Sequence, residues 1–282
     1  MITWRLERWR PPRVKPLEVW NLPYRDGLIY ERLSASFADE GGSSVDLELA
    51  QTLAVLCQLV APRETIWISG GLAARAGLQK AFRRYELARV RFSAEPLFPA
   101  EAGARAELAR RGVANGLVVD LGQTSLKLSG VKRAVIQRPL DALPVFLTEH
   151  APPPQNVRLE QAARLADFVS EAIAANIAPN APPALVLGLP CALDDRGTPG
   201  SCTYAGWTND ITWAPRMLSR IDALLPPSHS WHGREVLVLL ANDAELAAST
   251  AALELSRDVR SLVLTLGFGP GAAWLEPESA RG

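Results

Sequence analysis

Short apolar runs flanked by turn-forming residues recur along the chain, and each is typical of a strand buried on both faces. Patterns typical of helices follow several of these runs. The predicted strands cover residues 64–69, 88–92, 116–121, 183–190, 234–242 and 261–265, and the predicted helices cover 72–85, 101–109, 160–177 and the segment after 243. This alternation of strands and helices predicts an α/β protein.

A tight polar hairpin follows the apolar run 116–121. Its residues Asp120, Gly122, Thr124 and Lys127 have the spacing Asp-x-Gly-x-Thr-x-x-Lys. The glycine lets backbone N–H groups approach an anion closely, and the three polar side chains would surround that anion. The same residue types also form hairpin turns that bind nothing, so both interpretations stay open.

A second polar pair ends the predicted strand 234–242. Asn242 and Asp243 follow its apolar run directly and precede an alanine-rich helical pattern. A carboxylate at the carboxyl end of a strand opens into the crevice where α/β sheets bind ligands. Asp243 is therefore a candidate catalytic group, and its alternative role is to cap the helix that follows.

Glycines are concentrated after the predicted strand 261–265, in the segment Thr265-Leu-Gly267-Phe-Gly269-Pro-Gly271. With Ala272 they also satisfy the dinucleotide fingerprint Gly-x-Gly-x-x-Ala. That fingerprint requires a following helix, a second strand and an acidic residue about twenty positions further on. Because the sequence stops at Gly282, we expect a phosphate-binding loop instead.

Together with the turn Ser69-Gly70-Gly71 after strand 64–69, these segments resemble the ROK family of sugar kinases, in the actin, Hsp70 and sugar-kinase superfamily. The resemblance implies two ribonuclease-H-like lobes with a nucleotide cleft between them, and ATP and Mg²⁺ as cofactors. It implies that Asp120 positions Mg²⁺ through water, that the Gly-Gly turn contacts the adenosine, and that Asp243 is the catalytic base. The residues that it implies for the phosphates are Gly122, Gln123, Thr124, Lys127, Thr265, Gly267, Gly269 and Gly271.

The order of these segments differs from the order in the family. In ROK kinases the adenosine segment follows the second glycine loop, whereas here it precedes the first. A circular permutation accounts for this order, and permutation is tolerated when the original termini lie close together at the surface. The expected lobes are residues 113–250, with the first phosphate loop and Asp243, and residues 1–112 plus 251–282, with the adenosine segment and the second glycine loop.

The polar segment after the predicted strand 183–190 resembles the sugar pocket of the same family. Gly188-Leu-Pro190 resembles its Gly-x-Pro-Gly motif, with Cys191 in place of the last glycine. An ordinary surface loop has a similar composition, and Trp207 also suits a position in a core. The residues implied to bind a sugar are Pro190, Asp194, Trp207, Asn209, Asp210 and Asn242.

One motif of the family has no counterpart in this sequence. ROK kinases carry a Glu-x-Gly-His segment that grips the sugar hydroxyls, and residues 1–44, which take its place in the permuted order, contain none. The resemblance is therefore closer for the nucleotide than for the sugar.

Composition excludes several classes of protein. The chain has 282 residues, enough for two domains, and its 30 basic and 30 acidic residues cancel, so no net positive charge is available to hold a nucleic acid. The 3 cysteines are widely spaced, which favours a reducing compartment, and no apolar run is long enough to span a bilayer. We expect a cytoplasmic protein without a membrane partner, and an exposed connector around His229 and His232.

The sequence thus predicts ATP-dependent phosphoryl transfer to a hydroxyl of a sugar or a similar small molecule, with Asp243 as the general base. The alternative is a nucleotide-binding regulator, or a degenerate member of the same fold, that transfers nothing to a small molecule. The sequence does not predict the identity of the acceptor or the oligomeric state.

Overall fold

The computed structural model describes residues 1–17, 23–24, 27–28, 43–85, 89–144, 154–200, 205–267 and 271–278. The chain forms two compact units, each with a sheet of its own. Unit 1 consists of Met1–Trp9 and Ala104–Asp243, and unit 2 consists of Arg10–Gly103 and Ala244–Gly282. The protein is therefore an α/β protein with two mixed sheets, as the alternation of predicted strands and helices indicated.

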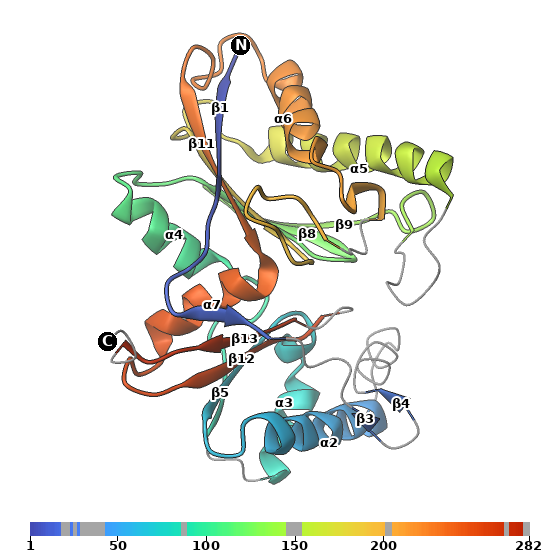
Figure 1. Cartoon of the computed structure of the whole chain (residues 1–282), viewed down its shortest axis with the longest axis vertical. Coiled ribbons are helices and arrows are strands. Elements are labelled where there is room, and N and C mark those ends of the chain that lie inside the picture. Colours follow the sequence, from blue (N-terminus) through green and yellow to red (C-terminus); the bar gives the residue numbers. More distant parts are fainter. Residues whose placement is uncertain are drawn as a thin grey trace. The chain divides into compact units, whose positions relative to one another are not determined.

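Unit 1 is built on a six-stranded sheet (Figure 1). Strands β7, β8 and β9 form an antiparallel meander, and β10, β11 and β1 continue the sheet on the other side of β7, all parallel to it. The order across the sheet is β1 (Thr3–Arg8), β11 (Glu235–Asn242), β10 (Ala184–Leu189), β7 (Leu117–Leu121), β8 (Ser125–Ser129) and β9 (Arg133–Gln137).

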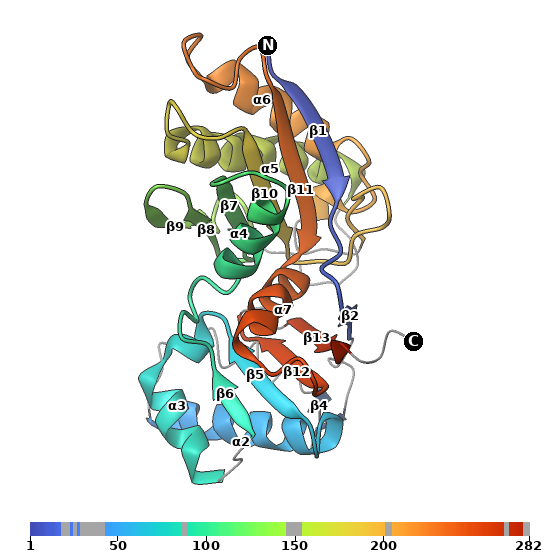
Figure 2. The same ribbon diagram turned by 90° about the vertical axis from the view of Figure 1, so that its left-hand side faces the viewer.

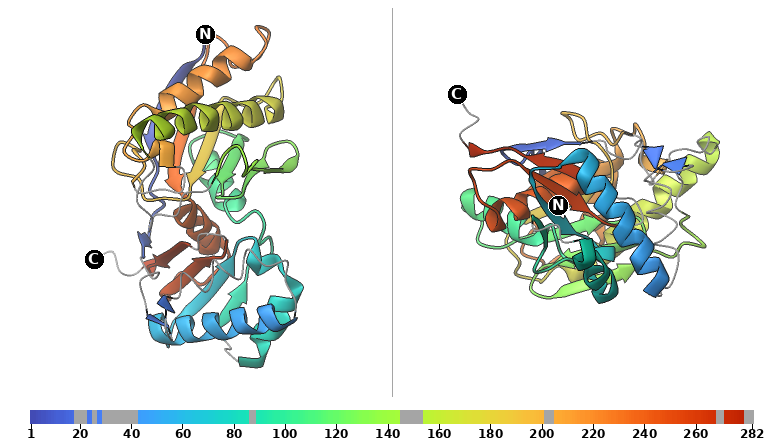
Figure 3. Two further views of the ribbon diagram at one scale, coloured as in Figure 1. Left: turned by 90° about the vertical axis from the view of Figure 1, so that its right-hand side faces the viewer. Right: turned by 90° about the horizontal axis from the view of Figure 1, so that it is seen from below.

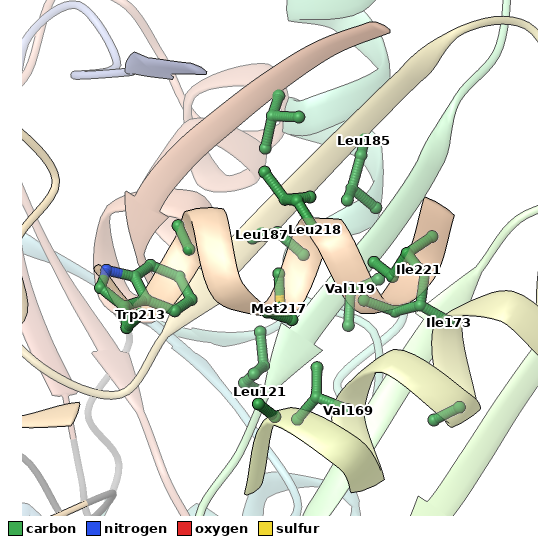
Figure 4. Packing of buried hydrophobic residues seen from close by; sticks show 14 of the residues in the cluster. Val119, Leu121, Val169, Ile173, Leu185, Leu187, Trp213, Met217, Leu218 and Ile221 are labelled. Carbon is green, nitrogen blue, oxygen red and sulfur yellow. The ribbon is translucent and has the colours of Figure 1, made fainter. Parts of the chain in front are cut away.

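Two helices, α5 (Gln155–Asn176) and α6 (Trp213–Leu224), cover one face of this sheet, and α6 is preceded by the 3₁₀ turn η3 (Ala205–Trp207). Figure 4 shows their apolar side chains meeting those of the central strands. The labelled residues are Val119, Leu121, Val169, Ile173, Leu185, Leu187, Trp213, Met217, Leu218 and Ile221. Burying each such side chain contributes about 1.5–3 kcal/mol, so this layer supplies much of the stability of unit 1.

The opposite face of the same sheet is covered in part by helix α4 (Glu101–Arg110), most of which belongs to unit 1 (Figure 2). Leu108 of α4 is fully buried, and its Cδ1 lies 2.7 Å from where a Cβ on Gly116 would be, so Gly116 makes room for the helix. Strands β7 and β10 are thus buried on both faces, which explains their apolar runs 117–119 and 184–187.

Unit 2 has a five-stranded sheet with the order β2 (Val14–Pro16), β13 (Gly271–Leu275), β12 (Ser261–Thr265), β5 (Thr65–Ser69) and β6 (Val90–Phe92). A separate pair, β3 (Pro23–Tyr24) and β4 (Gly27–Leu28), is antiparallel. The helical elements are α2 (Ser43–Val60), η1 (Leu72–Ala74), α3 (Ala76–Phe82), η2 (Arg83–Tyr85) and α7 (Asp243–Glu254), of which α7 begins with the last residue of unit 1. Figure 3 shows α2 and α3 beside this sheet.

Side chains on the two faces of the sheet in unit 2 belong to two different apolar clusters. Ile66 and Ile68 of β5 pack in a cluster with α2 and α3. Trp67, between them in the sequence, packs in a second cluster with alanines of α7, and its indole N–H donates to Glu254 over 2.7 Å. Successive side chains of a strand point to opposite faces, so each apolar run serves both layers.

The two sheets have the same strand order. In unit 1, β7 to β11 are counted as strands one to five. Across the sheet they then follow the order three, two, one, four, five, and β1 is added at the edge beyond β11. Unit 2 has the same arrangement if β2 is counted after β13: the antiparallel strands β12, β13 and β2 come first, and the parallel strands β5 and β6 follow.

Each predicted strand and helix has a counterpart in the structure, but the helix predicted from residue 160 begins at Gln155, and the predicted helix 72–85 consists of three short elements, η1, α3 and η2. The units differ from the expected lobes 113–250 and 1–112 plus 251–282, because Met1–Trp9 and Ala104–Gly112 belong to unit 1 and Ala244–Thr250 to unit 2. Strand β1 joins unit 1 because its backbone pairs with β11. None of the described helices is long and apolar enough to cross a membrane.

The prediction of an exposed connector around His229 and His232 is wrong for the first histidine. His229 is only 3% exposed, and its Nε2 lies 3.1 Å from the carbonyl oxygen of Ala178. The neighbouring Trp231 is fully buried and meets Trp4 of β1 edge to face, with ring centroids 6.0 Å apart. The tryptophan draws the segment into the core despite its polar neighbours, because it buries a large apolar area.

The link from α4 to β7 is held by a buried carboxylate. Glu107 accepts hydrogen bonds from Arg110 and Arg111 at 2.6–2.9 Å, and Arg111 also pairs with Glu7 of β1. Burial favours the protonated form of Glu107, but the hydrogen bonds and charges of the two arginines outweigh it and lower its pKa. The ion pairs thus fasten the end of α4 to the edge strand of the same unit.

We expect Glu107→Gln to lower the melting temperature at neutral pH, because the variant loses the ion pairs. Since the folded-state pKa of Glu107 is lowered, its contribution is present above the unfolded-state pKa, about 4.3, and is lost as the pH falls through the folded value. Thermal unfolding across a pH series checks this: the difference between wild type and variant should narrow in acid.

A matched control is Glu160→Gln, which breaks the exposed pair of Glu160 with Arg164 on α5. Exposed pairs contribute about 0–1 kcal/mol, so this variant should melt close to wild type at every pH. A difference for Glu107→Gln that stays constant down to the lowest pH would contradict the assigned role of its charge.

Candidate functional site

In unit 1 the predicted site residues come together at one edge of the sheet. Asp120 pairs in register with Gly188, and Leu189 pairs with Asn242, so the carboxyl ends of β7, β10 and β11 coincide. Asp120, Pro190 and the pair Asn242-Asp243 therefore lie along the same edge, although they are far apart in the sequence. This is the edge at which α/β sheets bind ligands.

The hairpin between β7 and β8 carries a cross-strand ion pair. Asp120 and Lys127 occupy opposite positions in the ladder, and Lys127 Nζ lies 3.0 Å from Asp120 Oδ2. Both side chains are largely buried. The pair holds an ammonium group and a carboxylate at the edge of the sheet in a fixed arrangement.

The turn between these strands contains Gly122, Gln123 and Thr124. A Cβ on Gly122 would lie 2.9 Å from the carbonyl oxygen of Ser125, so the turn is tight enough to disfavour a side chain there. Gln123 Oε1 is buried and has no hydrogen-bond partner in the part of the chain that the structure describes. An acceptor of this kind is a position where a bound ligand or water would supply the missing donor.

The next strand end is held by an amide side chain. Asn242 Nδ2 donates to the carbonyl oxygens of Leu189, at 3.3 Å, and Cys191, at 2.9 Å. These bonds fix the segment around Pro190 against the end of β11. Asp243 is partly exposed and is the first residue of α7, so both interpretations of this carboxylate, as a base and as part of a helix start, remain compatible with its position.

Asp194, one of the predicted sugar ligands, is engaged by its own loop. Its Oδ1 accepts the backbone N–H groups of Arg196, at 2.8 Å, and Thr198, at 2.7 Å. The backbone bond from Thr198, assisted by the other local hydrogen bonds, lowers the pKa of Asp194. The carboxylate therefore stabilises the turn that contains Gly197, and this role alone accounts for its presence.

Trp207, Asn209 and Asp210 lie in the turn before α6. Trp207 is fully buried, with its ring 4.9 Å from that of Trp213, so the core position is the one it occupies and its faces are not available for stacking on a sugar. Asp210 accepts from the N–H and hydroxyl of Thr212 at the start of α6, and Arg216 donates to its Oδ2 over 2.7 Å. Asn209 is exposed and has a positive φ of 58°, which asparagine tolerates.

In unit 2 the two predicted glycine segments are brought together by a parallel ladder. Ser69 of β5 pairs in register with Thr265 of β12, and the Leu266 N–H donates to Ser69 O over 2.7 Å. Gly70 has a φ of +98°, and a Cβ there would lie 2.3 Å from Leu266 O. The Gly-Gly turn thus lies directly against the start of the second glycine loop.

The second glycine loop leaves a hydroxyl unpaired. Thr265 Oγ1 is buried without a hydrogen-bond partner among the described residues. Gly267 follows two residues later, and Gly271 opens β13 opposite Thr265 in the antiparallel ladder. Gly71 precedes η1 in the right-handed helical region. Gly269 lies outside the described residues.

These observations are compatible with the expected cofactors. Among the residues that the structure describes, Gln123 Oε1 finds no donor and Thr265 Oγ1 no partner, as expected of groups that meet a phosphate or metal-bound water in a ligand complex. Asp120 is the only carboxylate within the predicted phosphate hairpin, and a search of the described residues for clusters of three or more His, Cys, Asp or Glu finds none. Mg²⁺ usually keeps several waters and needs few protein carboxylates, so a single one suits it.

One residue that contacts the first turn escaped the sequence analysis. Arg138, at the end of β9, donates from its guanidinium to Gln123 O, and its N–H donates to Thr124 O. The sequence contains a weak signal: the predicted hairpin leads into Arg138-Pro139, a cation at the end of an alternating strand.

No protein-family model, curated protein or solved structure matches the chain.

We expect Gly70→Ala to destabilise unit 2 by about 3 kcal/mol, because it combines a left-handed backbone with a clash against main-chain atoms. Gly112→Ala is the matched control: Gly112 has a φ of +79° but no neighbour within 4 Å of a Cβ, so it should lose only about 1 kcal/mol. Urea unfolding followed by tryptophan fluorescence measures both. Equal losses would mean that the contact with Leu266 is easily relieved.

Proposed function

We propose that the protein binds ATP with Mg²⁺ and transfers the terminal phosphoryl group to a hydroxyl of a small molecule, with Asp243 as the general base. The observation that carries the proposal is the meeting of Asp120, Lys127, Asn242 and Asp243 at the carboxyl edge of one sheet. A cation and two carboxylates at such an edge suit phosphoryl transfer, which needs charge neutralisation and a proton acceptor.

The strand orders support a more specific fold within this proposal. We propose that units 1 and 2 are the two ribonuclease-H-like lobes of an actin-like fold, circularly permuted. The support is the shared order of the two sheets, which unit 2 attains only by taking its third strand, β2, from the beginning of the chain. A permutation predicts this arrangement, in which β2, from the beginning of the chain, is the neighbour of the last strand, β13.

When bound, MgATP supplies an activated phosphoryl group whose charge the metal ion partly neutralises. In the proposed reaction Lys127 provides positive charge for the phosphates, and the carboxylate of Asp120 holds the metal ion through water. In unit 2, Thr265 Oγ1 would provide a neutral donor for the nucleotide, whereas the Gly70 N–H already donates to Pro96 O over 2.8 Å and would contact the nucleotide by packing alone. Asp243 accepts the proton of the acceptor hydroxyl as that oxygen is phosphorylated, a role that typically contributes about 10²–10⁴-fold to the rate.

A second candidate function is nucleotide binding without transfer to a small molecule. It is favoured by the local engagement of three predicted sugar ligands: Asp194 holds its own turn, Asp210 holds the start of α6, and Trp207 is buried in the core. The other predicted sugar ligands are Pro190, Asn209 and Asn242. They are neither core residues nor carboxylates that hold a turn, but three residues do not define a sugar site.

Calorimetric titration with ATP tests the first step. We expect saturable binding that weakens when Mg²⁺ is removed with a chelator, because the metal ion offsets the repulsion between Asp120 and the phosphates. GTP serves as a comparison for the base. The absence of heat at millimolar ATP would overturn the proposal for both candidate functions.

We expect Asp243→Asn to leave ATP affinity within about twofold of wild type while lowering the transfer rate by about 10²-fold or more, because the amide cannot accept the proton. ADP release in a screen of sugars and other polyols measures transfer. Asp141→Asn, at an exposed position of unit 1, is the control and should behave like wild type. An Asp243→Asn variant with wild-type turnover would remove Asp243 from the mechanism.

A further inference from the structure

Arg138 is a buried cation that meets the first phosphate turn from behind. Only 3% of its surface is exposed, although arginine is rarely buried to this extent. The guanidinium donates hydrogen bonds to main-chain carbonyls. Nε donates to Leu143 O over 2.7 Å, Nη1 to Gln123 O over 3.2 Å, and Nη2 to Pro144 O over 2.7 Å. Three carbonyl groups from two separate segments thus converge on one side chain.

The main chain of Arg138 engages the same turn. The β8–β9 ladder ends at the pair Ser125 and Gln137, and the Arg138 N–H continues it with a bond of 2.8 Å to Thr124 O. Consecutive carbonyls of the turn, those of Gln123 and Thr124, are therefore both bound to one residue. With their oxygens fixed toward Arg138, the peptide planes of the turn have little freedom to rotate.

This geometry matters for the proposed phosphate contacts. A backbone anion site depends on N–H groups whose direction is set before the ligand arrives, because preorganised dipoles need no rearrangement on binding. Arg138 holds the carbonyl oxygens of Gln123 and Thr124 in the turn. Bonds to carbonyl oxygens set the orientation of the peptide planes, so the residue is suited to orient the turn.

We propose that Arg138 is the positioning residue of the first phosphate turn, holding Gln123 and Thr124 in the conformation that receives the phosphates of the nucleotide. This inference rests on the proposed function. Arg138 would connect the turn to the segment Leu143-Pro144. The planar fork of the guanidinium, more than its charge, would then be what the turn requires.

The test compares Arg138→Lys, which keeps the charge but loses the fork, with Arg105→Lys. Arg105 also donates to carbonyls of unit 1, those of Ser129 and Gly130 at the other end of β8, and the sequence analysis gives it no role in the phosphate turn. Affinities for MgATP and for adenosine are measured by calorimetry on the full chain. Adenosine lacks phosphates, so the ratio of the two affinities reports on the phosphate turn and cancels any loss of folded protein.

We expect Arg138→Lys to weaken MgATP binding about tenfold, the effect of losing one charged hydrogen bond, while adenosine affinity stays at the wild-type value. Arg105→Lys should leave both affinities unchanged. Hydrogen exchange should also be faster in the peptide that covers residues 121–125 of the Arg138 variant. Should Arg138→Lys fold poorly, Arg138→Gln, which removes the buried charge as well, gives the same comparison.

The outcomes separate this inference from the proposed function. Wild-type protein that binds neither ATP nor adenosine overturns the proposed function, and the role of Arg138 in phosphate binding fails with it. Wild-type binding with an unchanged affinity ratio in both Arg138 variants overturns the inference alone. A parallel loss of MgATP and adenosine affinity would also overturn it, because a merely structural role would affect both ligands.

Discussion

Parallel backbone pairing is the constraint on which the rest of this structure depends. In unit 1 the registers of β7 with β10 and of β10 with β11 set the ends of three strands side by side, and these ends carry Asp120, Asn242 and Asp243. The pairing is possible only because helices bury both faces of the central strands, so that no competing hydrogen bonds to water remain. The same rule holds in unit 2, where the ladder between β5 and β12 sets Ser69 beside Thr265.

The loops at these edges are of two kinds. In one kind the polar side chains satisfy the loop itself: Asp194 accepts the N–H groups of its own turn, and Asp210 does the same at the start of α6. In the other kind a side chain from another element holds the loop, as Asn242 holds the Pro190 segment. Buried polar atoms of such loops, for example Gln123 Oε1, then have no partner among the described residues. Sites that bind ligands are expected among loops of the second kind, since folding alone does not use up their hydrogen-bonding groups.

The sequence predicts the strands and helices well because the central strands are buried on both faces and read as uninterrupted apolar runs, as in 184–187 and 236–241. It also predicts which polar residues end those strands. It could not reveal that β1 joins unit 1, since that depends on pairing with a strand more than 200 residues away. The sequence left the burial of Trp207 open and did not indicate that of His229, because a polar neighbourhood in the sequence does not report the packing partners that these rings meet.

The placement of β2 beside β13 has a consequence for how the protein is made. Strands β7 to β11 are synthesised in one continuous stretch after β1. All six strands of the sheet in unit 1 are therefore present once Asn242 is synthesised. Unit 2 is different: α2, β5 and β6 are synthesised early, yet the central strand β12 and its partner β13 come last. Ile66 and Ile68 can meet α2 and α3 early, but the edge of β5 that pairs with β12 has no partner strand until residues 261–265 are synthesised. An unpaired strand edge of this kind can pair with another chain, so the order of synthesis leaves unit 2 open to aggregation for longer than unit 1.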